Sequence, residues 1–98
     1  MCWVHEWAYA WRNIYMTVQH VEKAKLKMKF RAERFPRKRE KYLKAYEECE
    51  EIIKTLQDVQ KRIENLIYTY GIIIKPEVIQ RLLTPPKMLP AEKWVEKN

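Results

Sequence analysis

Residues 42–71 read YLKAYEECEEIIKTLQDVQKRIENLIYTYG and carry the strongest pattern in the chain. One seam recurs there in steps of four and three, and its members are Tyr46, Cys49, Ile53, Leu56, Gln60, Ile63, Ile67 and Tyr70. A heptad seam of this length predicts an α-helix packed on a partner helix. Ile52, Val59 and Leu66 run beside the seam and widen it, which favours a bundle helix over a strict two-stranded coiled coil. We expect Gly71 to end this helix as its C′ residue.

The first half of the chain carries a matching stripe. Its central column, repeated every seven residues, is Trp7, Ile14, Val21, Met28 and Phe35, with Trp3, Ala10 and Ala24 on one side and Val4, Trp11 and Val18 on the other. Residues 23–32 lie within the stripe and read KAKLKMKFRA, where basic and apolar residues alternate as in a half-buried strand. These residue types are good helix formers and none is β-branched, so we predict a helix here too.

Pro36 separates the two helical runs, and proline both breaks a preceding turn and suits the first turn of a new helix. We therefore predict an all-α fold, a long antiparallel αα-hairpin with its bend near Pro36, in which residue i faces roughly residue 72 − i. The single domain, 1–98, comprises helix 1–35, helix 37–70 and a tail 71–98 with short helices. The tail is too apolar for a solvated linker and either folds back on the open end or docks on a neighbouring copy. One long helix kinked at Pro36 is the alternative.

Length and composition restrict the class of protein. A chain of 98 residues forms one domain with a modest core, which makes association with further copies into a helical bundle plausible. Lysine, glutamate and isoleucine are plentiful, a composition that resembles heat-adapted proteins. The cysteines lack disulfide or zinc spacing, and neither a signal peptide nor a transmembrane segment is recognisable. We expect a cytoplasmic protein in a reducing environment.

The positive charge is concentrated in one segment. Residues 23–44 hold eleven basic and two acidic residues, a net charge of +9, while the whole chain carries +7. At the expected bend this places a basic tip, which consists of Lys27, Lys29, Arg31, Arg34, Arg37, Lys38, Arg39, Lys41 and Lys44. Such a cluster gains affinity for a phosphate backbone by counterion release, without reading sequence. We predict non-specific binding of DNA or RNA. An acidic protein, or less readily a membrane surface, is the alternative partner, and a solvated helix face without a partner remains open.

A second set of residues is predicted to contact partners. Leu26 and Phe30 should form an exposed apolar pair among cations, and Gln60, the polar member of the seam, should meet a polar partner. The full set of candidate interface residues is Trp3, Trp7, Trp11, Leu26, Phe30, Gln60 and Trp94. Together these residues predict a homo-oligomer, either as a nucleic-acid binder or as a structural subunit, adaptor or inhibitor within a larger assembly.

The sequence offers little for catalysis. It has no serine, a single aspartate, two histidines far apart and no glycine-rich phosphate loop. Cys2 with His5, or His20 with Cys49, would supply two ligands each, short of a structural zinc site. We therefore expect no enzyme activity, no metal and no cofactor.

Overall fold

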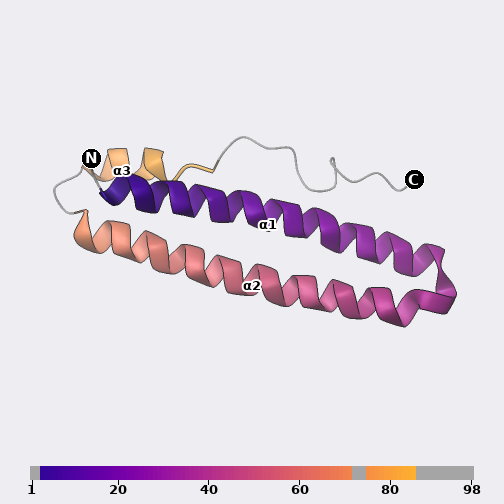
Figure 1. Cartoon of the computed structure of the whole chain (residues 1–98). Coiled ribbons are helices and arrows are strands. Elements are labelled where there is room, and N and C mark those ends of the chain that lie inside the picture. The colour runs from indigo at the N-terminus through magenta and orange to yellow at the C-terminus, as the bar shows by residue number, and fades with distance from the viewer. Residues whose placement is uncertain (1–2, 72–74, 86–98) are drawn as a thin grey trace.

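The computed structural model describes residues 3–71 and 75–85, and every regular element within them is helical. Helix α1 spans Trp3–Arg34, the 3-10 turn η1 spans Pro36–Lys38, α2 spans Arg39–Tyr70 and α3 spans Pro76–Leu82. α1 and α2 run antiparallel, side by side, and η1 joins them at one end (Figure 1). The predicted hairpin is confirmed, and a single helix kinked at the proline is excluded. None of the described helices is long and apolar enough to cross a membrane.

Proline determines where the chain turns. Phe35 leaves the helical region, with φ −119° and ψ 80°, as expected for a residue before proline. Its N–H donates to the Arg31 carbonyl at 2.9 Å, and the Lys38 N–H donates to the Phe35 carbonyl at 2.9 Å. No side chain caps either helix at this bend. The turn is therefore closed by backbone hydrogen bonds, with Pro36 placed where no amide donor is needed.

Contacts across the hairpin confirm the expected register. The pairs in contact are Trp7 with Tyr70, Trp11 with Gln60, Lys25 with Tyr46 and Arg31 with Tyr42. Their residue numbers add to between 71 and 77, close to the predicted 72. The bend at Pro36 is therefore enough to set which levels of the two helices meet.

The centre of the α1 interface differs from the prediction. The buried members of this helix are Val4, Ala8, Trp11, Val18 and Ala32, so the central column is the one through Val4, Trp11 and Val18. The column predicted as central is half-buried from Trp7 to Met28, and Phe35 at its end is 42% exposed. Both columns carry large apolar residues, so periodicity alone did not distinguish the centre from its flank. In α2 the predicted seam is confirmed from Tyr46 to Ile67, with Ile53 and Ile67 buried and its other members half-buried. Tyr70, predicted as its last member, is 58% exposed.

Lys25 occupies the central column of α1 between Val18 and Ala32. Its Nζ lies 3.3 Å from Glu22 of the same helix and 5.5 Å from the centre of the Tyr46 ring. The ion pair of Lys25 is therefore within α1, while its contact with α2 is to an aromatic ring.

The open end of the hairpin is closed by the start of the tail. Val4 and Ala8 of α1, Ile67 of α2 and Ile79 of α3 form one buried cluster. α3 lies alongside the first turns of α1 (Figure 1). Folding back is therefore confirmed for this part of the tail, while residues 86–98 lie outside the described residues.

Gly71 ends α2 by close approach rather than by a left-handed turn. Its φ is −91°, and its N–H donates to the Ile67 carbonyl at 2.8 Å. A Cβ at this position would lie 2.6 Å from that carbonyl oxygen and 3.5 Å from Val4 Cγ2. Glycine is needed because a Cβ would collide with the last turn of α2 itself, whereas its contact with Val4 of α1 would be ordinary. The prediction of a C′ residue is corrected to a C-cap.

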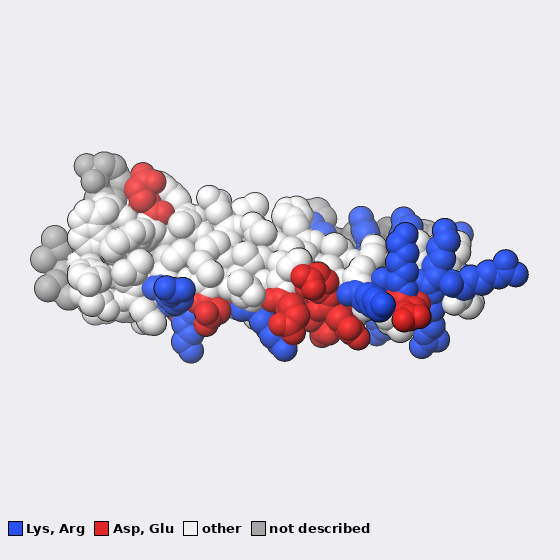
Figure 2. Space-filling view, turned by 60° about the horizontal axis from the view of Figure 1, so that its bottom comes forward, with Lys and Arg blue, Asp and Glu red and all other residues white. Residues whose placement is uncertain are grey.

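The two flanks of the hairpin differ in chemistry. One flank lacks charged side chains, and this apolar face consists of Trp3, Trp7, Ala10, Ile14, Thr17, Val21, Ala24 and Met28 from α1 with Ala45, Cys49, Ile52, Leu56, Val59, Ile63, Leu66 and Tyr70 from α2. Figure 2 shows a broad surface free of Lys, Arg, Asp and Glu along much of the hairpin, with charges along one edge and at the bend. The opposite flank carries Glu22, Lys29, Glu50 and Glu64 in the equivalent columns.

Candidate nucleic-acid interface

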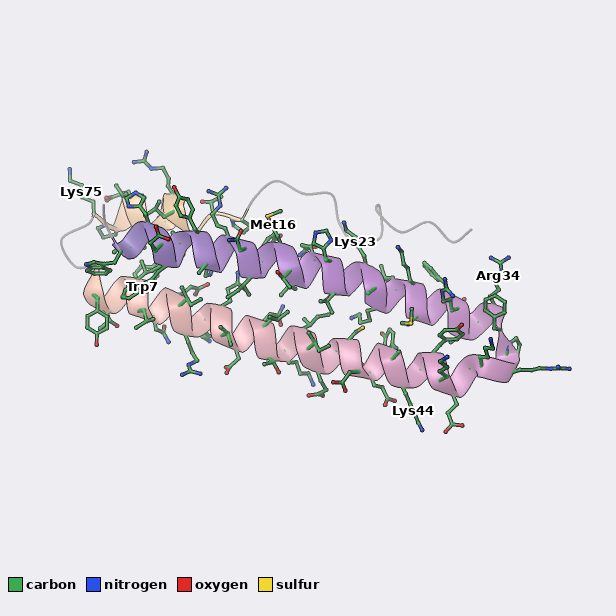
Figure 3. The ribbon with its side chains drawn as sticks, in the orientation of Figure 1. Trp7, Met16, Lys23, Arg34, Lys44 and Lys75 are labelled. Carbon is green, nitrogen blue, oxygen red and sulfur yellow. The ribbon has the colours of Figure 1, made fainter. Side chains whose placement is uncertain are left out.

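The bend brings all nine residues of the predicted basic tip to one end of the molecule. Every one of them is exposed. Lysine and arginine side chains gather there in the space-filling view (Figure 2), and Arg34 and Lys44 extend from different helices near the bend (Figure 3). The tip therefore presents cations from the end of α1, from η1 and from the start of α2.

Acidic side chains compensate little of this charge. Within residues 3–71 and 75–85, Lys44 is the only member of the tip that forms an ion pair, with Glu40 at 3.6 Å. Both side chains are mostly exposed, so the pair contributes little. The remaining charge is free to interact with an external anion.

Two aromatic rings form the base of the tip. Phe35 and Tyr42 lie with ring centres 6.4 Å apart, one from each side of the bend. Arg31 stands 5.9 Å from the Tyr42 ring and Arg34 stands 5.6 Å from the Phe35 ring. These cation–π contacts orient two of the arginines and leave their charge available.

Phe35 is a candidate residue that the sequence reasoning missed. It was placed on the core stripe, yet its ring is exposed among arginines. The signal was its position directly before Pro36, where the helix ends and the side chain leaves the seam. An exposed ring among cations is suited to stacking on an unpaired base.

The backbone at the bend adds little net charge. The N-terminus of α2 and the C-terminus of α1, both 32-residue helices, meet there, so their opposite partial charges largely offset each other. The positive potential of the tip therefore comes from its side chains. A shallow depression beside the bend has a lining of mixed charge, which consists of Pro36, Arg37, Arg39, Glu40, Leu43, Lys44 and Glu47.

The tryptophans predicted to contact partners are distributed between core and surface. Trp11 is 6% exposed, and its Nε1 donates to Glu64 Oε1 at 2.7 Å, so it packs within the hairpin rather than against a partner. Trp7 is half-buried and contacts both Trp3 and Tyr70. Trp3 is 48% exposed. Trp94 lies outside the described residues.

The other predicted interface residues are less accessible than expected. Leu26 and Phe30 are half-buried, which corrects the prediction of an exposed pair. Gln60 is also half-buried, and its Nε2 lies 3.5 Å from the Trp11 carbonyl oxygen, a long hydrogen bond. Its polar partner is thus found inside the hairpin.

The structure and the comparisons add no further chemistry. Among the described residues, no group of three or more His, Cys, Asp or Glu side chains is arranged to hold a metal ion. Comparisons with protein-family models, curated proteins and solved structures found no match for this chain. The fold and the site define this protein as a helical hairpin with one basic end.

Proposed function

We propose that this chain is a non-enzymatic helical interaction protein that binds the phosphate backbone of nucleic acid through its basic tip. The observation that carries the proposal is the grouping of nine exposed cations at one end of an elongated molecule, of which Lys44 alone forms an ion pair with a described residue. Each cation that meets a phosphate releases condensed counterions, and this gain does not depend on base sequence.

The shape of the tip favours contact with the backbone over base readout. Its cations extend from two helix ends and a three-residue turn rather than from one recognition helix, as in a major-groove reader. Phe35 adds one exposed ring, which favours single-stranded or looped nucleic acid over a closed duplex.

The experiment is a salt series with the purified protein and two labelled probes of unrelated sequence, one a duplex and one a single strand. We expect binding to both, with affinity falling by at least about a hundredfold between roughly 50 and 200 mM salt. Equal affinity for several sequences is expected too. Absence of binding to either probe at low salt would overturn the proposal.

The alternative is a structural subunit, adaptor or inhibitor whose basic tip meets an acidic protein or an anionic membrane. Its support is the same charge, because carboxylates and lipid headgroups also attract exposed cations. Vesicles containing phosphatidylserine form a second arm of the experiment. Binding to vesicles without binding to either nucleic acid would favour this alternative.

A further inference from the structure

The apolar face is unlike the rest of the surface of the hairpin. Its outer columns include Ile52, Val59 and Leu66, which are more than one-third exposed although they repeat every seven residues. Its inner column on α1, from Trp7 to Met28, is half-buried. Exposed apolar side chains in a continuous heptad pattern mark a helix-packing surface that the single hairpin does not use.

The size of this face matches what a stable dimer needs. From Trp3 to Met28 the face extends for about 38 Å at 1.5 Å per residue, and two adjacent helices are about 20 Å wide. The resulting area is about 750 Å² per copy, near the roughly 800 Å² per partner of a standard interface. α3 does not use it, because α3 packs at the open end on Val4 and Ala8.

A second copy of the chain is the occupant that fits the pattern. The face is built equally from α1 and α2, so two copies laid face to face place helix against helix, as in a four-helix bundle. A partner of this kind offers the same heptad spacing and the same absence of charge. Such a contact is self-complementary, which a twofold axis requires.

Charge decides how the two copies are oriented. Residues 23–44 of each copy carry +9, and a parallel arrangement would put both basic tips together. An antiparallel arrangement places them at opposite ends. With the axis at the middle of the apolar face, each bend lies about 31 Å away and the tips are about 60 Å apart. That separation exceeds the Debye length of about 10 Å several times, so the tips no longer repel.

We propose that a second copy of this chain packs on the apolar face in antiparallel orientation, forming a four-helix bundle with a basic tip at each end. The twofold axis passes at the level of Val59, the middle member of the column from Ile52 to Leu66. Val59 then meets its own counterpart. This inference rests on the fold and stands apart from nucleic-acid binding.

Sedimentation equilibrium tests the interface. The parent is expected at about twice its 12.1 kDa chain mass at micromolar concentration. Val59→Lys should raise the dissociation constant more than about a hundredfold, because two unpaired ammonium groups would be buried. Ile52→Lys should act in the same direction. Circular dichroism checks that each variant keeps its helices.

Met16→Lys is the matched control. Met16 is 40% exposed and Val59 is 37% exposed, and Met16 points away from α2 (Figure 3). We expect this control to dimerise like the parent. A compact parent monomer at tens of micromolar, or a folded Val59→Lys variant that dimerises as tightly as the parent, would overturn the proposal.

A distance measurement tests the orientation. A spin label is placed at Lys38→Cys after replacement of Cys2 and Cys49 by alanine, and pulsed electron paramagnetic resonance gives the separation between copies. The antiparallel bundle predicts about 60 Å. A separation under about 30 Å would show parallel pairing and overturn the orientation.

Discussion

Trp11 joins the two helices by a directional bond as well as by packing. Its indole donates to the half-buried Glu64 at 2.7 Å, its ring stacks on Tyr15 with centres 6.2 Å apart, and its backbone carbonyl accepts from Gln60. Hydrogen bonds to a charged acceptor are stronger than neutral ones and demand a fixed geometry. This group of residues therefore holds the register between α1 and α2 near the open end.

Trp11→Phe removes the donor and keeps most of the apolar ring. We expect a loss of about 1 to 2 kcal/mol in the free energy of unfolding, since Glu64 is left half-buried without its partner. Urea unfolding followed by circular dichroism measures it. Trp3→Phe is the control, because that ring is 48% exposed in the single hairpin and forms no hydrogen bond with the described residues. This substitution keeps an apolar ring on the apolar face and should change stability by less than about 0.5 kcal/mol. Equal effects of the two substitutions would show that the bond to Glu64 contributes nothing.

At the scale of the helix, the central column of α1 has one charged member, Lys25, whose ammonium group is costly to bury. Val4, Trp11, Val18 and Ala32 are buried, whereas Lys25 keeps its ammonium beside Glu22 and Tyr46 with 19% of its side chain exposed. A charge at a seam position usually costs stability and can fix register.

Lys25→Leu should raise the free energy of unfolding by about 1 kcal/mol, because an apolar side chain replaces a partly desolvated charge on the seam. Thermal unfolding gives the comparison. Lys27→Leu serves as the control on an exposed position of the same helix and should leave stability within about 0.5 kcal/mol of the parent. A destabilised Lys25→Leu variant would mean that the contacts with Glu22 and Tyr46 outweigh the desolvation of the ammonium.

These elements show how far the sequence alone leads. Periodicity predicts the two helices, and the chemistry of Pro36 predicts the bend. The position of the bend then predicts which residues of the two helices face each other. The centre of the α1 seam does not follow, because Trp7, Ile14 and Val21 are as apolar as Val4, Trp11 and Val18. Which of these two apolar columns is buried depends on how α1 is rotated against α2. The exposed Phe35 was missed for a different reason, because its place on the stripe hid that α1 ends at Arg34.

At the scale of the whole molecule, charge and apolar surface occupy different parts of the hairpin. The basic tip was predictable from the sequence because its residues all lie in one segment, 27–44, on both sides of the predicted bend. The apolar face was not, since it combines columns from two helices whose relative rotation the sequence leaves open. Binding of an anion at the tip and packing along the shaft can therefore proceed without competing for the same residues.

Because the basic tip and the apolar face are separate, we predict that the charge of the tip can be removed without unfolding the hairpin. Replacing Arg34, Arg37, Lys38 and Arg39 by glutamine removes four exposed cations at the bend and no buried contact. The matched control replaces four cations outside the tip by glutamine, namely Arg12, Lys61, Arg62 and Lys75, which are also exposed. Both variants should keep the helical content of the parent.

The most direct measurement of the central claim is the slope of log affinity against log salt for duplex DNA, compared among the parent and these two variants. Each lost phosphate contact lowers the slope by about 0.9, so the tip variant should be flatter than the parent by about 3 to 4 and bind at least tenfold more weakly at low salt. The control variant should stay within about one unit of the parent slope. Identical affinity and slope for the parent and the tip variant would contradict binding through the basic tip.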